Sequence, residues 1–376
     1  MSATRKLLIV TNDFPPRQGG IQSFVHELAR RLPAGQVAVY TSNYPGAAAF
    51  DADLGFPVRR HPSGLLIPTP GARRGVLQAR REFGSTSVWF GAAAPLGLLA
   101  GPLRRAGVRW MVASTHGHEA GWAMLPAARQ ALRRIGSKVD VVTYLTEYSR
   151  RRLAGAFGPR ANLAQLTPGV DLDNFSPEVS GAAVRQRHGL TGRPVVVCVS
   201  RLVPRKGQDV LIQAMPAILA KVPQAALLIV GGGPYEQRLR KLARRTGVAG
   251  NVVFTGPVPA AELPEHFAAG DVFAMPCRTR RLGMDVEGLG IVFLEASAAG
   301  LPVVAGDSGG APDTVRQGIT GLVVNGIDIV AVADRVSGLL ADPRRAAAMG
   351  TAGRKWAEQS WQWNTMADRL AELLRL

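Results

Sequence analysis

Two carboxylates, Glu287 and Glu295, stand eight positions apart in the segment Glu287-Gly-Leu-Gly-Ile-Val-Phe-Leu-Glu295. If most of this interval is helical, the rise of about 1.5 Å per residue separates them by about 12 Å. Carboxylates that cleave a glycosidic bond together lie about 5 to 10 Å apart. The pair is therefore expected to hold the two ends of one elongated ligand.

Two cations, Arg201 and Lys206, lie in a loop directly after the strand-like apolar run 195–199. An arginine offers a planar fork of donors and a lysine a mobile point charge, a combination suited to a diphosphate. A role as solvated loop cations is the alternative, and Arg205 between them is open to either interpretation. Two acids that can bind hydroxyls and two cations that can bind phosphates together indicate that the ligand is a nucleotide sugar.

Gly19 and Gly20 precede a segment with helical spacing, residues 21–32. Free amides at such a helix start can bind a phosphate, because no Cβ blocks the approach and the helix dipole favours anions. The alternative is a helix-entry turn that needs glycine geometry alone. Neither this loop nor residues 231–233 has the Gly-x-Gly-x-x-Gly spacing of a dinucleotide site, so a dehydrogenase is not expected.

Three further polar residues follow predicted strands of the first half. His116 and His118 come just after a strand that ends near Ser114, at the mouth of the first domain. Asp13 lies in the loop after the first strand, where it meets an acceptor hydroxyl or serves as a turn residue. For the two histidines, a site contact and an ordinary polar position in a loop both stay open, as do the two roles of Asp13.

Four segments carry a resemblance to a known family. They are Thr11-Asn-Asp-Phe-Pro-Pro-Arg-Gln-Gly-Gly-Ile21, Ser114-Thr-His-Gly-His-Glu119, Ser200-Arg-Leu-Val-Pro-Arg-Lys-Gly-Gln-Asp209 and Asp285-Val-Glu-Gly-Leu-Gly-Ile291. In this order they resemble the retaining glycosyltransferases, family 4 type, that share a Glu, seven residues and a Glu. The resemblance spans nearly the whole chain and is greatest to members that use GDP-mannose and act on phosphatidylinositol monomannoside.

The resemblance implies a role for each candidate residue. Glu287 would bind hexose hydroxyls, Glu295 the ribose diol, and His116 the hexose near its C6 hydroxyl, with His118 as the other candidate. The implied donor-binding residues are Gly19, Gly20, Arg201, Lys206, Val258, Gly288, Leu289, Gly290, Ile291 and Glu295, and the implied catalytic residues are Asp13, His116, His118 and Glu287. Val258 would present backbone groups to guanine. No metal and no other cofactor is expected.

The activity that the resemblance implies is retaining transfer of mannose from GDP-mannose to phosphatidylinositol monomannoside, through an α-1,6 linkage, to give the dimannoside. Same-face substitution is favoured, with the leaving phosphate accepting the acceptor's proton, and a covalent route stays open. Transfer of a hexose from another nucleotide, UDP included, or to another acceptor is the alternative. A phosphorylase would need a cofactor lysine or a phosphate site that is not found.

The chain has a net charge of +18, of which residues 1–168 carry +14 and the remainder +4. Such a basic half attracts an anionic membrane or nucleic acid. Arg133 and Arg134 lie on a stretch with Trp122, Met124, Leu125, Leu132 and Ile135, and the apolar loop 65–68 precedes Arg73 and Arg74. Basic residues beside apolar ones favour interfacial membrane contact. A solvated arginine-rich surface is the alternative. A basic nucleic-acid-binding protein is a remote one, because no nucleic-acid motif is present, and no such partner is expected.

The expected location is the cytoplasm, peripheral on the inner face of the plasma membrane. Cys198 and Cys277 are far apart and are expected to be free thiols, as in a reducing compartment. No signal-peptide core follows residues 1–6. The uncharged run 88–103 is shorter than the roughly 20 residues of a membrane span and is interpreted as a buried strand that turns into a helix.

Short apolar runs alternate with helix-length amphipathic segments, which predicts an α/β protein. The expectation is two Rossmann-like, doubly wound parallel-sheet domains facing each other across a cleft, the GT-B arrangement that the resemblance also implies. Predicted strands are 7–10, 37–41, 88–90, 110–114, 139–144, 195–199, 226–230, 252–255, 272–275 and 302–305. The expected domains are 1–168, which faces the acceptor and membrane, 169–355, which binds the nucleotide sugar, and a C-terminal helix, 356–376, that packs back on the first. The acids Asp171 and Asp173 in the linker are expected to be turn residues.

Overall fold

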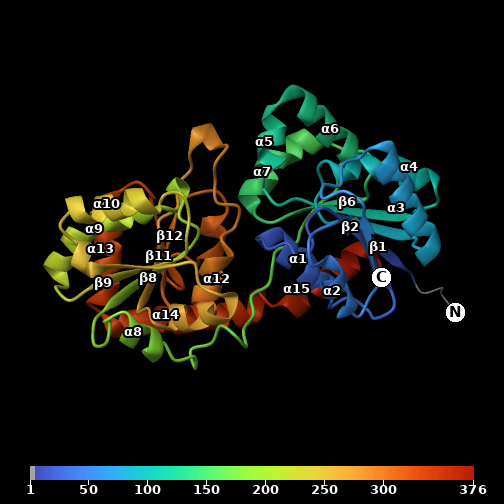
Figure 1. Cartoon of the computed structure of the whole chain (residues 1–376). Helices are drawn as coiled ribbons and strands as arrows, with labels where there is room; N and C mark the ends of the chain where they lie inside the picture. The colour runs from blue at the N-terminus through green and yellow to red at the C-terminus, as the bar shows by residue number, and fades with distance from the viewer. Residues whose placement is uncertain (1–4, 118) are drawn as a thin grey trace. The chain divides into compact units, whose positions relative to one another are not determined.

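The computed structural model describes residues 5–117 and 119–376. The chain divides into two compact units. Unit 1 comprises Met1–Gly169 and Trp363–Leu376, and unit 2 comprises Val170–Gln362 (Figure 1). Each unit is a parallel sheet between helices, so the predicted α/β class with two Rossmann-like units is confirmed.

The sheet of unit 1 has the strand order β3-β2-β1-β4-β5-β6-β7, and its strands are all parallel over the described residues. The strands are β1 (Leu7–Thr11), β2 (Val37–Ser42), β3 (Val58–His61), β4 (Ser87–Phe90), β5 (Trp110–Ser114), β6 (Val141–Tyr144) and β7 (Leu163–Gln165). The helices are α1 (Gly20–Ala29), α2 (Ala47–Ala52), α3 (Pro70–Phe83), η1 (Leu96–Leu99), α4 (Ala100–Arg105), α5 (Glu119–Met124), α6 (Pro126–Gly136), α7 (Glu147–Phe157) and α15 (Trp363–Leu374).

The sheet of unit 2 has the order β10-β9-β8-β11-β12-β13. Its strands are β8 (Val195–Val199), β9 (Ala226–Val230), β10 (Val252–Gly256), β11 (Val272–Met275), β12 (Val303–Gly306) and β13 (Gly321–Val324). The helices are α8 (Ala182–Arg187), η2 (Pro204–Lys206), α9 (Gln208–Lys221), α10 (Glu236–Arg245), η3 (Ala249–Asn251), η4 (Ala260–Glu262), α11 (Leu263–Ala268), η5 (Arg281–Gly283), α12 (Ile291–Ala298), η6 (Ala311–Thr314), α13 (Ile329–Leu340) and α14 (Pro343–Ser360).

The central strands explain why the sequence predicts this fold. Every residue of β1, β8 and β9 is buried, because helices cover both faces of each sheet. Strands buried on both faces need continuous rather than alternating apolar residues. The run 88–103 is also confirmed as a strand, β4, that leads into the helices η1 and α4.

Three strands were not predicted, and all of them lie at sheet edges. They are β3, β7 and β13. An edge strand pairs on one side only and tolerates polar or small residues, as in Val58-Arg-Arg-His61. The apolar run that marks a central strand is therefore missing from β3 and β7, whereas β13, Gly321-Leu-Val-Val324, is a short apolar run that was missed.

The segment predicted as one C-terminal helix from residue 356 is interrupted. Helix α14 ends at Ser360, and Trp361 packs edge-on against Trp356, with ring centroids 5.5 Å apart, within unit 2. Helix α15 begins at Trp363 and belongs to unit 1, where Trp363 packs against Phe24 of α1. The indole of Trp110 donates a hydrogen bond of 2.7 Å to the carbonyl of Leu373.

The apolar residues predicted to support membrane contact differ in exposure. Leu132 and Ile135 of α6 are fully buried in the core of unit 1, so their assignment to an interfacial face is wrong. Met124 and Leu125 are exposed, as are Leu65 and Ile67 of the loop before α3. A helical face that looks amphipathic in sequence thus contributes its apolar side to the core.

The acids of the linker have a structural role. The carboxylate of Asp171 accepts hydrogen bonds from the backbone amides of Asp173, 3.2 Å, and Asn174, 3.0 Å, and from the Asn174 side chain, 2.7 Å. Asp171 is therefore a turn residue, as predicted.

Helix α15 provides a test of how unit 1 is stabilised. Leu370 is fully buried, so Leu370→Ala is expected to lower the free energy of unfolding by about 2 to 5 kcal/mol through lost burial and a residual cavity. Denaturant unfolding measures the change. The matched control on the same helix is Glu372→Ala, which removes only an exposed contact with Arg369 and should change stability little. Equal effects of the two substitutions would contradict this packing.

Candidate functional site

The carboxyl ends of the unit 2 strands carry the residues predicted to bind the donor. Arg201 and Lys206 follow β8, and Val258 follows β10. Glu287 lies in the segment between β11 and α12, and Glu295 lies within α12. Because all these strands are parallel, their carboxyl ends form one edge, which is where open α/β sheets bind ligands.

Glycines bring the loops after β8 and β9 into backbone contact. The amide of Leu202 donates to the carbonyl of Gly232, 2.9 Å. A Cβ at Gly231, whose φ is +125°, would meet the carbonyl oxygen of Ser200, and one at Gly233 would meet that of Leu202. The triple glycine, which lacks a dinucleotide spacing, thus permits close contact between loops.

A buried ion pair joins two of the predicted site residues. The Lys206 Nζ lies 2.7 Å from Glu287 Oε2, and both residues are buried. Arg205 Nε lies 3.8 Å from the same oxygen and 3.7 Å from Asp285 Oδ1. Arg205, for which a solvent-facing position stayed open, therefore belongs to this charged cluster. The predicted diphosphate lysine is thus held by the predicted hexose acid.

The backbone of Glu287 is fixed by the loop after β12. Its amide donates to Ser308 Oγ, 3.2 Å, and its carbonyl accepts from the amide of Gly310, 2.9 Å. Helix α12 begins at Ile291, so Glu287 lies in an extended loop and only the second half of the interval to Glu295 is helical. The distance of about 12 Å that a mostly helical interval would give therefore does not apply.

The start of α12 is suited to an anion. Gly290 precedes the helix with φ +82°, a left-handed conformation that favours glycine, and a Cβ there would meet the Phe293 ring. Within the described chain no side chain caps this helix. Its first amides therefore point out of the helix without a side-chain acceptor, beside buried Leu289.

The surroundings of Glu295 raise its pKa. Its neighbours Phe293, Leu294 and Ala296 are fully buried, and burial of the carboxyl raises the pKa of Glu295 to about 7. No side-chain partner for Glu295 exists among the described residues. At neutral pH this acid is therefore partly protonated, and a ligand with hydroxyl donors would favour its ionised form.

Arg201 differs from Lys206 in its surroundings. Its side chain is exposed and has no ion-pair or hydrogen-bond partner in the described part of the chain. Its loop is fixed because Gln208 donates to the Arg201 carbonyl, 3.2 Å, and to Ser200 Oγ, 2.8 Å. A fixed backbone with an available guanidinium is suited to an incoming phosphate.

In unit 1, His116 is held in one orientation. Its Nε2 lies 2.6 Å from the carbonyl oxygen of Gly91, and because a carbonyl only accepts, Nε2 carries the proton. The Glu119 carboxylate accepts from the amides of His116, 3.0 Å, and Gly117, 3.1 Å. His118, the other candidate, lies outside the described residues.

Asp13 and the glycine pair are linked through Gln22, which sequence reasoning missed. Gln22 Nε2 donates to Asp13 Oδ1, 2.8 Å, and the Gln22 amide oxygen occupies the space that a Cβ at Gly19 would need. Gly19 has φ +157°, and Gly20 opens α1 with no side-chain cap in the described residues. Both glycines are exposed, so the start of α1 is accessible.

Other residues of the charged cluster also escaped prediction. Asp285 and Ser308 contact Arg205 and Glu287. The signal for Ser308 is the small-residue loop Asp307-Ser-Gly-Gly310 directly after a buried strand. The thiols were predicted correctly, because Cys198 and Cys277 are free and buried, and burial raises the pKa of each to about 12.

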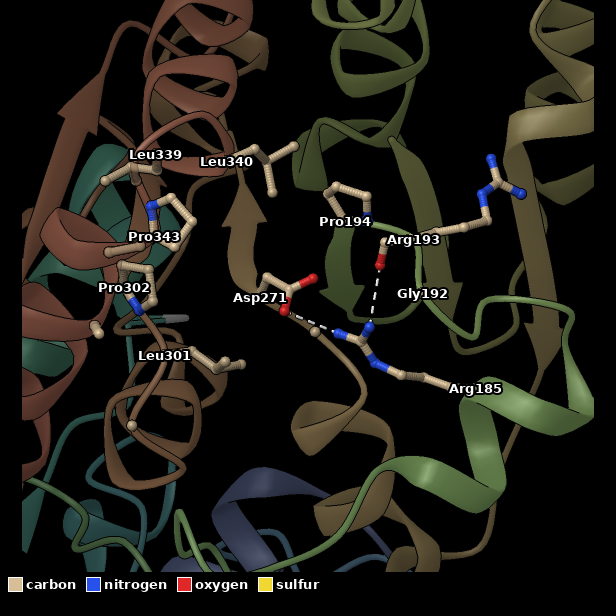
Figure 2. Close-up of a pocket in the computed structure, with 14 residues that line it drawn as sticks. Arg185, Gly192, Arg193, Pro194, Asp271, Leu301, Pro302, Leu339, Leu340 and Pro343 are labelled. Carbon is tan, nitrogen blue, oxygen red and sulfur yellow. Dashed lines mark hydrogen bonds and ion pairs between the residues drawn. The ribbon is translucent and has the colours of Figure 1, made fainter. Parts of the chain in front are cut away.

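A cavity of about 500 Å³ lies at the opposite, amino ends of the unit 2 strands (Figure 2). Asp271 and Arg185 face each other there at 2.9 Å, and the second Asp271 oxygen accepts from the amide of Val195, 2.7 Å. Leu301 and Leu340 form part of its wall. These polar groups bond to one another, and none of the predicted site residues lines this cavity.

Comparison with known proteins decides the family. The family model described as "Glycosyltransferase Family 4" matches residues 18–174, and the one described as "Glycosyl transferases group 1" matches residues 182–356. The GDP-mannose-dependent alpha-(1-6)-phosphatidylinositol monomannoside mannosyltransferase of Mycolicibacterium smegmatis is 58% identical, with 98% of each chain covered. This chain belongs to glycosyltransferase family 4.

Other members of family 4 are similar along the whole chain. The Corynebacterium glutamicum GDP-mannose-dependent monoacylated alpha-(1-6)-phosphatidylinositol monomannoside mannosyltransferase is 49% identical, covering 100% of this chain and 99% of its own. Among solved structures, Anabaena HepE in complex with UDP has a TM-score of 0.82 at 22% identity, covering 98% and 99% of the two chains. Sucrose-phosphate synthase of Thermosynechococcus elongatus has a TM-score of 0.79 at 22% identity, covering 99% and 98%. These structures share the fold, and the chain is an enzyme of the glycosyltransferase class with the GT-B fold.

The buried Lys206–Glu287 pair predicts a stability effect. Lys206→Met leaves the buried Glu287 carboxylate with only the longer contact to Arg205, 3.8 Å, and is expected to lower the free energy of unfolding by about 3 to 5 kcal/mol. Adding Glu287→Gln removes the stranded charge and should restore most of the loss. Chemical denaturation of the unliganded protein measures both variants.

The matched control is Lys221→Met, which breaks an exposed pair with Asp334 of the same length, 2.7 Å, and should leave stability unchanged. If Lys206→Met behaved like this control, the pair would not be a buried interaction.

The raised pKa of Glu295 predicts that donor affinity depends on pH. In the predicted binding mode, ribose hydroxyls donate to the ionised carboxylate, so binding should weaken about tenfold per pH unit below pH 7 and level off above it. Binding near pH 6.5 should also release a proton from Glu295. Titration calorimetry in two buffers of different ionisation enthalpy counts that proton.

Glu295→Gln is the control for this prediction, since it cannot ionise. The variant should lose the proton release and the acid-side weakening together. Proton release of the same size in the variant would assign the effect to another group.

Proposed function

We propose that this chain transfers mannose from GDP-mannose to phosphatidylinositol monomannoside with retention, forming an α-1,6 linkage and the dimannoside. The observation that carries the proposal is the 58% identity over 98% of both chains with a relative of that named activity. The arrangement of cations and acids at the carboxyl edge of unit 2 supports it independently, because it suits an elongated, diphosphate-bearing donor.

Arg201 and Lys206 are proposed to stabilise the departing diphosphate. Its negative charge grows as the glycosidic bond breaks, and fixed cations lower the barrier by interacting more strongly with that state. Lys206 exchanges Glu287 for the phosphate when the donor binds. The open start of α12, residues 288–291, adds backbone amides to the same anion.

Glu287 is then released to accept hydrogen bonds from the mannose hydroxyls, and Glu295 from the ribose. Val258 is proposed to present its backbone to guanine, after the strand β10. No assigned carboxylate acts as a nucleophile, so we infer same-face substitution in which the leaving phosphate takes the acceptor proton.

Unit 1 is proposed to receive the acceptor. His116, fixed by Gly91 in its Nε2-protonated form, would contact the mannose near its C6 hydroxyl. Asp13, aligned by Gln22, would orient the acceptor hydroxyl, and the exposed start of α1 at Gly19 and Gly20 would bind phosphate.

A peripheral position on the inner face of the plasma membrane completes the proposal. Exposed Leu65 and Ile67 lie in the loop just before α3, which carries Arg73 and Arg74. Exposed apolar side chains beside basic ones suit an anionic bilayer surface. Within the residues described, no helix is both long and apolar enough to cross a membrane.

The proposed function is tested by product analysis. Incubation with GDP-mannose and phosphatidylinositol monomannoside should yield the dimannoside, detected by mass spectrometry as a gain of one hexose. Arg201→Ala and Lys206→Ala should each lower kcat by about 10² to 10³ because one charge that stabilises the transition state is lost.

UDP-glucose and ADP-glucose serve as donor controls in the same assay. Product formed from either of these donors in preference to GDP-mannose would reject the proposed donor. Near-native turnover in both alanine variants would remove the assignment of the cations.

A further inference from the structure

The segment between β11 and α12 projects from unit 2 and carries an unpacked apolar tip. It forms the orange excursion that rises away from the rest of its unit in Figure 1. Leu282 is 93% exposed and Met284 58% exposed. Large apolar side chains with this exposure on a protruding turn indicate a surface with a partner.

The backbone of the tip has an unfavourable conformation at two residues. Arg281 and Leu282 have φ of +49° and +53°, a left-handed conformation that is unfavourable for residues with a Cβ. No packing of Leu282 within its own unit offsets this cost, since its side chain is almost fully exposed. Backbone strain without internal compensation is typical of segments that act on a ligand or surface.

The base of the excursion is anchored to the charged cluster of the site. Arg280 and Asp285 exchange two backbone hydrogen bonds, 2.9 and 3.2 Å, and their side chains lie 3.7 Å apart. Arg278 pairs with Asp209 at 2.7 Å, and its amide donates to the carbonyl of Arg205. The tip is thus a rigid projection from the loops that hold Glu287.

The charge around the tip is positive. Residues 278–284 contain three arginines and no acid. Asp209, which pairs with Arg278, also accepts from the hydroxyl of Tyr235 at the start of α10, 3.3 Å. Helix α10 carries five cations and one acid, and its cations are all exposed. Asp209 thus links the base of the excursion, at Arg278, to the residue that precedes α10.

We propose that the tip 280–284, together with the exposed basic face of α10, is a membrane contact of unit 2 that inserts Leu282 into an anionic bilayer. Apolar side chains enter the interface between headgroups and chains, while arginines bind the anionic headgroups. A protein partner would require a shaped apolar surface, whereas a turn with exposed Leu282 and Met284 next to exposed Arg281 suits a fluid interface. This contact is separate from the one proposed for unit 1. It rests on the proposed function in one respect, because a lipid acceptor gives the protein a reason to bind a membrane.

A fluorescent label tests the insertion directly. Leu282→Cys is labelled with an environment-sensitive NBD group in the full chain. Cys198 and Cys277 are buried and do not compete for the label. With vesicles of phosphatidylcholine and phosphatidylinositol the emission should brighten and shift to the blue, and with pure phosphatidylcholine the response should be weaker.

The matched control is Ile319→Cys, also labelled, whose parent side chain is 51% exposed in the turn before β13, at the amino edge of the same sheet. It should show no change with either vesicle. Equal responses at 282 and 319, or none at 282, would overturn the proposal.

A second pair of variants separates this contact from catalysis. Leu282→Asp should weaken binding to anionic vesicles by about tenfold, because burial of one leucine is lost and a like charge meets the headgroups. GDP-mannose affinity and transfer to a short-chain, water-soluble acceptor should be unchanged, while transfer to acceptor in vesicles falls. Unchanged vesicle binding by Leu282→Asp rejects the membrane contact, whereas absence of transfer to the soluble acceptor by the unmodified protein rejects the proposed function instead.

Discussion

The buried contact between Lys206 and Glu287 is the interaction on which the site of unit 2 depends. Two opposite charges in a poorly solvated position are stable only while they are paired. In this chain the partners come from loops after different strands, and the loop after β12 fixes the acid through Ser308 and Gly310. The pair therefore connects three strand ends and holds the lysine beside the acid. In the proposed function, a diphosphate that displaces the acid would meet a cation that is already largely desolvated.

This electrostatic arrangement suits chemistry driven by a charged leaving group. Lys206, Arg201 and the start of α12, which no described side chain caps, supply positive charge, while desolvation raises the pKa of the partly buried Glu295, so that hydroxyl donors would favour its ionised form. In the proposed donor complex, the burial that raises the pKa of Glu295 would make its interaction with a ribose selective, because only a ligand with donors at that point offsets the loss of hydration. The two acids would then bind the two ends of the donor.

Much of the fold follows from the sequence because central strands are buried on both faces and read as continuous apolar runs. The edge strands β3 and β7 escape because pairing on one side leaves polar and small residues tolerated, whereas β13, Gly321-Leu-Val-Val324, is a short apolar run that was missed. The residue types at the site were predictable from their place after strands, and Arg201, Lys206 and Glu287 do lie at one sheet edge. The contacts between these side chains were not predictable, because they depend on how separate loops approach one another. They are the pairing of Lys206 with Glu287, the place of Arg205 in the charged cluster, and the hydrogen bond from Gln22 to Asp13. Helical periodicity was also ambiguous in α6, where Leu132 and Ile135 belong to the core.

The central claim is that the donor's diphosphate takes Lys206 from Glu287. Calorimetric titration of GDP, which lacks the hexose, into the unmodified protein and into Glu287→Gln tests it most directly. Removal of the competing carboxylate should make GDP bind more tightly to the variant, while GDP-mannose binds less tightly because a hexose contact is lost. Weaker or unchanged binding of GDP to Glu287→Gln would contradict the account.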